Sequence, residues 1–155
     1  MCVFKGKERL AMMATVLLSV TIMVGCASNF KYSYDAKTRF PDLKSYAWAP
    51  SSSLDPLVET NVRDFADQLL AQKGFKKMPE KADLMIKMGY EFYYGNKNSY
   101  ELQGLNLFIY KTENSELVWQ GTALGTIDTD AASGNLKQVV EGILANFPPK
   151  EPKEK

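Results

Sequence analysis

Alternating apolar and polar residues predict several strands along the chain. Residues 84–94 form the longest such segment, with Lys87 and Glu91 on one face. The opposite face of this segment carries the apolar side chains Leu84, Ile86, Met88, Tyr90, Phe92 and Tyr94. Residues 105–109 and 117–124 alternate in the same way, and a polar turn at 112–115 separates them. This pattern predicts an antiparallel meander.

Two shorter aromatic segments precede the meander. Residues 30–34 alternate aromatic with polar side chains, which predicts a half-buried strand. Residues 45–48 place Tyr46 and Trp48 on one face of a second strand, after a turn at 40–43.

Helical periodicity predicts two amphipathic helices. Asp55 is the expected N-cap of the first helix, Pro56 its first residue and Gly74 the residue that ends it. Its apolar stripe consists of Val58, Val62, Phe65, Ala66, Leu69 and Leu70. The second helix is stopped by Pro148 and contains Gly142, which costs about 1 kcal/mol relative to Ala. Its stripe consists of Leu136, Val139, Val140, Ile143, Leu144 and Phe147.

The element order β-β-α-β-β-β-α predicts an α+β fold. Because both helices are amphipathic, each is expected to cover one face of a single antiparallel or mixed sheet of about five strands. We expect one domain over residues 31–149, followed by a disordered charged tail at 150–155.

The N-terminus has the pattern of an export signal over residues 1–25. Three basic residues precede an uncharged run of 15 residues from Leu10 to Val24. The end of this run and the two residues after it, Met23-Val24-Gly25-Cys26, resemble the lipobox of bacterial lipoproteins, in which the cysteine is acylated. We therefore expect a lipidated Cys26 and a tether over 26–30. The alternative is an uncleaved membrane anchor over residues 10–30.

The lipobox resemblance implies that the protein is attached to a lipid bilayer. The resemblance implies attachment to it through acylated Cys26, and stable attachment requires more than one acyl chain. No Asp follows Cys26, which in a bacterium with two membranes favours the outer membrane, with the domain facing the periplasm.

Composition removes several classes of chemistry. The chain has no His, which excludes Ser-His-Asp catalysis and His-ligated metal sites. Its 19 basic and 18 acidic residues offer no charge for nucleic-acid binding. Cys2 lies in the expected signal and Cys26 would be lipidated, so no thiol remains for a disulfide within the domain.

Two acidic patterns have simple structural explanations. Asp128-Thr129-Asp130 lacks the other positions of a calcium loop, so a polar turn with a helix-capping acid is expected there. Asp64 and Asp67 lie on the polar side of the first helix and are expected to be solvated. No metal, cofactor or enzymatic activity is predicted.

Aromatic residues supply the remaining candidate contacts. Tyr90, Phe92 and Tyr94 continue the apolar face of their strand and are assigned to the core. Tyr93 falls on the opposite face, and Tyr100 lies near the turn at 95–99. These two tyrosines are therefore the candidates for contact with a ligand or partner.

The order of several motifs resembles a known family. They are Tyr34-Asp35, Lys44-Ser45-Tyr46-Ala47-Trp48-Ala49, Lys73-Gly74-Phe75, Ala82-Asp83-Leu84, Leu117-Val118-Trp119-Gln120-Gly121-Thr122-Ala123 and Ile143-Leu144-Ala145-Asn146-Phe147-Pro148-Pro149. Together they resemble the bacterial lipoprotein family known as domain of unknown function 4136. The resemblance implies a lipoprotein with an α+β fold and implies no chemistry.

These observations favour a membrane-anchored, non-enzymatic envelope lipoprotein that acts as a protein-interaction or accessory module, with an envelope protein as its partner. The alternative is an envelope lipoprotein that binds a small ligand or a glycan through Tyr93 and Tyr100. A hydrolase that uses carboxylates is the third hypothesis and the weakest.

Overall fold

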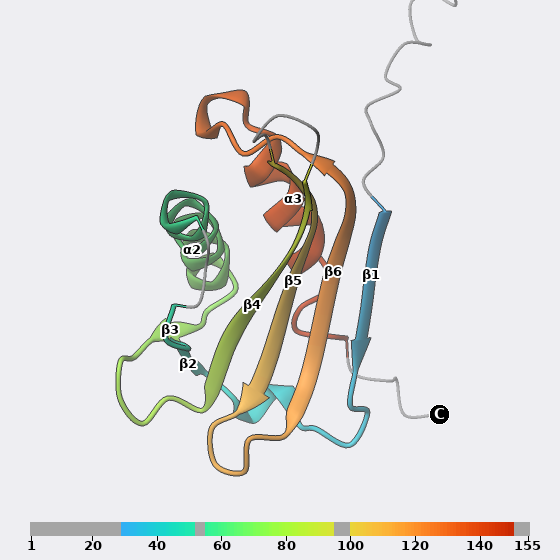
Figure 1. The fold of residues 1–155 in the computed structure, drawn as a ribbon. Coiled ribbons are helices and arrows are strands. Elements are labelled where there is room, and N and C mark those ends of the chain that lie inside the picture. The colour runs from blue at the N-terminus through green and yellow to red at the C-terminus, as the bar shows by residue number, and fades with distance from the viewer. Residues whose placement is uncertain (1–28, 52–54, 95–99, 151–155) are drawn as a thin grey trace, which may run out of the picture.

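Three long antiparallel strands form the centre of a single mixed sheet (Figure 1). They are β4 (Leu84–Tyr94), β5 (Tyr100–Lys111) and β6 (Leu117–Ile127), and they confirm the predicted meander. The computed structural model describes residues 29–51, 55–94 and 100–150, except for the side chain of Tyr100.

Three shorter strands complete the sheet in the order β1-β6-β5-β4-β2-β3. β1 (Asn29–Tyr34) pairs antiparallel with β6, and β2 (Ser45–Trp48) pairs parallel with β4. The sixth strand, β3 (Lys76–Lys77), was not predicted because two residues are too few to show alternation. The α+β class is confirmed, with one strand more than expected.

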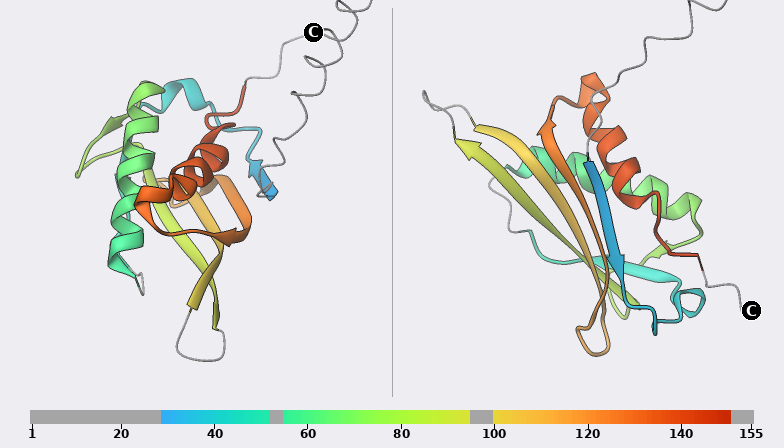
Figure 2. Two further views of the ribbon diagram at one scale, coloured as in Figure 1. Left: turned by 90° about the horizontal axis from the view of Figure 1, so that it is seen from above. Right: turned by 90° about the vertical axis from the view of Figure 1, so that its right-hand side faces the viewer.

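The first helix begins and ends as predicted. α2 spans Pro56–Gln72, and the Asp55 carboxylate accepts hydrogen bonds from the backbone N–H groups of Leu57 and Val58. Gly74 follows the helix with φ of 86°, a left-handed conformation that glycine adopts without strain. Figure 2 shows α2 and α3 on the same face of the sheet.

The second helix, α3 (Asn135–Leu144), ends three residues before Phe147. The structure gives a reason for Gly142, because a Cβ added there would lie 2.2 Å from Cζ of Phe30. Glycine therefore leaves room for a β1 ring to lie on the helix. Short 3₁₀ helices at Phe40–Asp42 and Ala131–Ser133 precede β2 and α3, respectively.

The core lies between the sheet and the two helices and is centred on Trp119. Its ring is fully buried and contacts Phe147, with ring centroids 5.3 Å apart. Gly121 provides the space for this ring, because a Cβ there would lie 2.2 Å from Cη2 of Trp119. In the described residues, no helix has the length and apolar character needed to cross a membrane.

Two predictions about strand burial were wrong. All six residues of β1 are exposed, although residues 30–34 were predicted to be half buried; β1 lies at the sheet edge. The strand also begins at Asn29, before the expected domain start at residue 31, because Asn29 and Phe30 already pair with β6. Tyr94, assigned to the core, is 67% exposed because β4 extends past the helices at its end (Figure 2).

Candidate functional site

The two predicted contact tyrosines lie at the same end of the β4–β5 hairpin but do not pair with each other. Tyr93 pairs with Glu101 and Tyr94 pairs with Tyr100 across the two strands. Tyr93 is 61% exposed, as expected for the face opposite the core. The side chain of Tyr100 lies outside the described part of the chain, and so does the whole of Cys26.

A second group of exposed aromatic side chains, which we call the β1 aromatic stripe, lies along β1. It consists of Phe30, Tyr32 and Tyr34, which are 44%, 50% and 41% exposed. Tyr32 and Tyr34 stack with ring centroids 6.4 Å apart, and Tyr34 meets the buried ring of Phe40 edge-on. The alternation of residues 30–34 correctly placed the three rings on one face, but it could not show that this face stays open.

The position of β1 in the sheet explains this exposure. β6 pairs with one side of β1, and no strand within the described residues pairs with its other side. The opposite edge is β3, which has only two residues, both lysines. Short length and lysine are common protections of a sheet edge. β1 is longer and carries a single charge, Lys31, so it is the less protected edge.

A polar cluster between α2 and β2 corrects the prediction that Asp67 is solvated. The Asp67 carboxylate accepts hydrogen bonds from Tyr46 Oη at 2.8 Å, Trp48 Nε1 at 2.7 Å and Lys77 Nζ at 2.7 Å. Burial raises the pKa of the Tyr46 hydroxyl, and the hydrogen bond to Asp67 raises it further. Asp64, by contrast, is exposed as predicted. This cluster holds the helix on the sheet.

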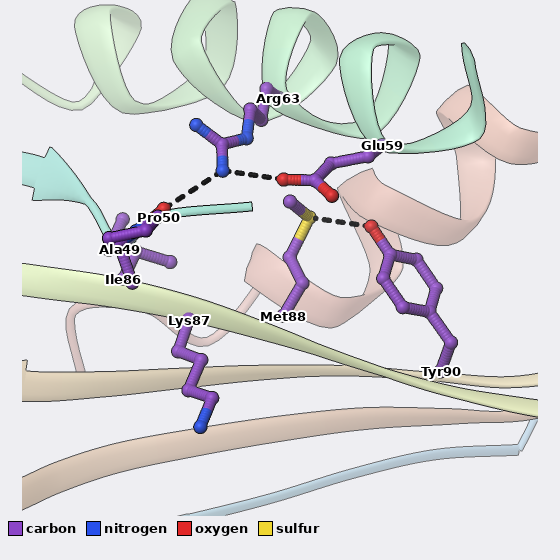
Figure 3. A pocket seen from close by; sticks show the side chains of 8 residues that line it. All are labelled: Ala49, Pro50, Glu59, Arg63, Ile86, Lys87, Met88 and Tyr90. Carbon is purple, nitrogen blue, oxygen red and sulfur yellow. Dashed lines mark hydrogen bonds and ion pairs between the residues drawn. The ribbon is translucent and has the colours of Figure 1, made fainter. Parts of the chain in front are cut away.

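A buried carboxylate, Glu59, lies beside this cluster and was not predicted. It is 4% exposed and accepts hydrogen bonds from Ser51 Oγ and from Arg63 Nη2, of which Figure 3 shows the second. Arg63 also donates to the carbonyl of Ala49, and its guanidinium carbon lies 5.3 Å from the ring centroid of Trp48. The cavity here has a volume of about 10 Å³, room for about one water molecule. It is too small for a substrate.

Two larger hollows are open to solvent. The first has a volume of about 440 Å³ and is lined in part by Asp83 and Lys111. The Asp83 carboxylate accepts hydrogen bonds from the hydroxyl and N–H of Ser45 and from the N–H of Lys44. The Ser45 hydroxyl makes the largest contribution to lowering the pKa of Asp83. These bonds join the starts of β2 and β4, which is a structural role.

The second hollow lies beside β1, on the sheet face that the helices leave uncovered. Its volume is about 210 Å³, and Lys31, Ser33 and Gln120 contribute to its lining. It therefore extends the exposed surface of the β1 edge.

The acidic turn before α3 supplies a capping acid, as predicted, but to the 3₁₀ helix at Ala131–Ser133 and not to α3, whose N-cap is Gly134. Asp130 accepts a hydrogen bond from the N–H of Ala132, and Asp128 accepts one from the N–H of Asp130. Among the described residues, no group of three or more His, Cys, Asp or Glu side chains is placed to hold a metal ion.

Solved structures share this fold at low sequence identity. A PDZ domain protein from Parabacteroides distasonis ATCC 8503 aligns with a TM-score of 0.63 and 15% identity, over 81% of this chain and 36% of that one. The chain thus spans about a third of that protein's length. A PelC dodecamer from Paraburkholderia phytofirmans aligns with a TM-score of 0.55 and 13% identity, over 80% of this chain and 100% of that one. No curated protein matches the chain in sequence.

The family comparison covers most of the chain. The family described as "Domain of unknown function (DUF4136)" matches residues 30–149, from the second residue of β1 to the segment after α3. The family predicted from the sequence motifs is therefore confirmed. The chain belongs to the DUF4136 family.

Proposed function

We propose that this chain is an envelope lipoprotein, held on a bilayer by acylated Cys26, whose domain is not an enzyme and acts by protein–protein contact at the β1 edge. The observation that carries the proposal is the β1 aromatic stripe on an open edge strand. That strand begins three residues after Cys26. The residue that follows Cys26 is not Asp, which supports a position on the outer membrane facing the periplasm.

The chemistry of the edge suits an extended protein segment. An open edge strand presents unpaired backbone N–H and C=O groups that a further strand can bind. The three exposed rings of the β1 aromatic stripe leave about 100 Å² each in contact with solvent, or roughly 300 Å² together. A stable interface needs about 800 Å² on each partner. The stripe is therefore the apolar centre of a contact that the strand edge completes.

One of the solved structures suggests a specific form of this contact. The PelC protein, which has a similar fold, is a dodecamer. Self-association through β1 and binding of a different envelope protein are therefore the two forms of the proposed contact.

Photocrosslinking in intact cells tests the contact. Benzoylphenylalanine replaces Tyr32 in the full chain, and the control replaces Leu57, an apolar residue that is 70% exposed on α2. We expect a discrete crosslinked product from position 32 alone, and its mass distinguishes a second copy from a different protein. Absence of a product at position 32, or the same products from both positions, would contradict the proposed contact.

Intact mass of the membrane-extracted protein tests the lipid attachment. We expect a mature chain that starts at Cys26 and carries acyl mass. Cys26→Ser should abolish both the cleavage and the added mass. A full-length chain without acyl mass would instead support an anchor over residues 10–30.

Binding of a glycan or small ligand through Tyr93 is the second candidate function. The observation that favours it is the exposure of Tyr93 at the hairpin end. A saturable change in tyrosine fluorescence with envelope glycans, lost in Tyr93→Ala, would support it. The absence of any fluorescence change would contradict ligand binding through Tyr93.

A further inference from the structure

The place where β1 begins determines how close the domain lies to the membrane. Only Ala27 and Ser28 separate Cys26 from Asn29, the first residue of β1. Three residues of fully extended chain span at most about 10 Å. If Cys26 is acylated, as proposed above, Asn29 therefore lies within about 10 Å of the bilayer surface.

The sheet register brings the end of β4 closer to the bilayer than Asn29. Asn29 pairs with Leu124, Leu124 with Gly104, and Gly104 with Glu91, so Glu91 lies in the same row as Asn29. β4 runs opposite to β1 and continues three residues past this row to Tyr94. At about 3.3 Å per residue, these three residues extend about 10 Å beyond Asn29 toward the bilayer. This equals the greatest length of the tether, so the end of β4 can reach the bilayer surface.

The figures show the same arrangement. The β4–β5 hairpin ends at the end of the sheet where β1 begins, and it curves away from both helices (Figures 1 and 2). Its last described residues, Tyr93 and Tyr94, are 61% and 67% exposed. As consecutive strand residues they point to opposite faces, so a tyrosine ring is presented on each side of the hairpin.

Tyrosine suits this position because its ring is apolar and its hydroxyl is polar. Tyr and Trp concentrate at the interface between a bilayer and water for this reason. We propose that Tyr93 and Tyr94 at the β4–β5 hairpin end lie in the headgroup region of the bilayer and seat the domain on it. This inference rests on the proposed acylation of Cys26.

The acidic groups at this end set the orientation. Glu101 pairs with Tyr93, and its carboxylate accepts a hydrogen bond from Gln103. Asp128 and Asp130 precede the 3₁₀ helix at Ala131–Ser133, which lies near the same end of the sheet (Figure 1). Because anionic headgroups repel carboxylates, Glu101 opposes contact at the hairpin end, but the two carboxylates of the acidic turn oppose it more strongly, so the domain is expected to tilt toward the hairpin.

Site-specific fluorescence measures the contact directly. The acylated protein is placed in vesicles of phosphatidylethanolamine and phosphatidylglycerol, with NBD attached to Tyr93→Cys or, separately, to Tyr94→Cys. The matched control carries NBD on Glu113→Cys, which is exposed in the turn at the opposite end of the same sheet. Acylation of Cys26 leaves the introduced cysteine as the one free thiol of the mature chain. Spin-labelled lipids in the vesicles then quench any NBD group in the interface.

We expect lipid quenching and a blue-shifted emission at positions 93 and 94, and neither at 113. An acylated protein whose labels at 93 and 94 respond like the label at 113 would overturn this inference and leave the lipid attachment intact. A blue shift without lipid quenching would show that protein covers the hairpin end, which also overturns it. A protein without acyl mass would overturn both proposals. Unchanged thermal unfolding of each labelled variant confirms that the domain is folded.

Discussion

Substitution of Gly121 tests whether the core around Trp119 is as closed as the structure indicates. Gly121 and Trp119 lie on the same face of β6, two residues apart, and the indole ring extends over the glycine. A Cβ at residue 121 would lie 2.2 Å from Cη2 of Trp119 and 2.8 Å from Cγ2 of Ile143. Gly121→Ala therefore adds one methyl group to a space that two side chains already fill.

The size of the effect follows from what these neighbours can do. Carbon atoms in contact prefer a separation of about 3.5–4.0 Å, so the indole has to retreat by more than about 1 Å. Trp119, Ile143 and the adjacent Phe147 are all essentially fully buried, so the movement is passed on to other core residues. Overpacking of this kind costs about 1–3 kcal/mol. We expect about 2–3 kcal/mol for Gly121→Ala, since no neighbour can move into solvent.

Gly89→Ala is the matched control. A Cβ at residue 89 would lie 3.0 Å from Cε2 of Phe108, a partly exposed side chain on the sheet face without helices. Phe108 can move outward, and Ala lowers the entropy of the unfolded chain, so the net change should stay within about 0.5 kcal/mol.

Urea unfolding followed by tryptophan fluorescence measures both free energies of unfolding. For a domain of this size each kcal/mol lowers Tm by roughly 3–6 °C, so Gly121→Ala should lower it by about 10 °C. Equal free energies of unfolding for the two variants would refute the argument that Trp119 is held in a closed space.

Three further predictions concern the other contacts described above. Asp67→Ala leaves the buried Tyr46 hydroxyl without its acceptor and should cost about 2–3 kcal/mol in urea unfolding; a cost near zero would contradict the role of this cluster. The pKa of Asp83 is lowered in the folded state, so its contribution to stability is present above its ordinary pKa of 3.8 and is lost as the pH falls through the lower folded value. The urea midpoint of Asp83→Asn should therefore fall less than that of the wild type between pH 5 and pH 2.5, and parallel profiles would disprove this linkage. Gly142→Ala gains about 1 kcal/mol of helix propensity but displaces the Phe30 ring; it should stabilise a Phe30→Ala background more than the wild type, and equal effects in both would show that the ring does not rest on the helix.

The local signals in the sequence predicted the elements well. Asp55 caps the first turn of α2 with its side chain, and Gly74 ends the last turn with its left-handed backbone conformation. Both effects involve only neighbouring residues, so the sequence pattern could reveal them. The meander was predicted because alternation over residues 84–94 and 105–109 reports which side chains share a face. Gly142 looked like a cost within the helix, and only the contact with Phe30, from the other end of the domain, explains it.

The candidate site depended on contacts that alternation and spacing do not encode. Asp67 lies on the polar side of its helix, and that position predicted a solvent-exposed side chain. Its partners Tyr46 and Trp48 are 21 and 19 residues away in the sequence, so helical spacing could not reveal these hydrogen bonds. The exposure of the β1 aromatic stripe depends on β1 being an edge strand. Periodicity assigns residues to a face, but it does not report whether a further element covers that face.

The two proposals together restrict the kind of partner that can reach β1. With Asn29 near the bilayer and β1 running away from it, Tyr34 lies about 17 Å further from the membrane, at about 3.4 Å per residue. The entire edge then lies within about 30 Å of the bilayer surface, since the tether adds at most about 10 Å. A partner strand at this edge has to lie in the same thin layer, alongside the domain and not above it. Proteins held on or in the same membrane meet this condition and also gain a high effective concentration from it. A second copy of this chain and a membrane-bound envelope protein both meet it, so the protein captured by photocrosslinking at position 32 should itself stay with the membrane fraction in cells that have not been crosslinked.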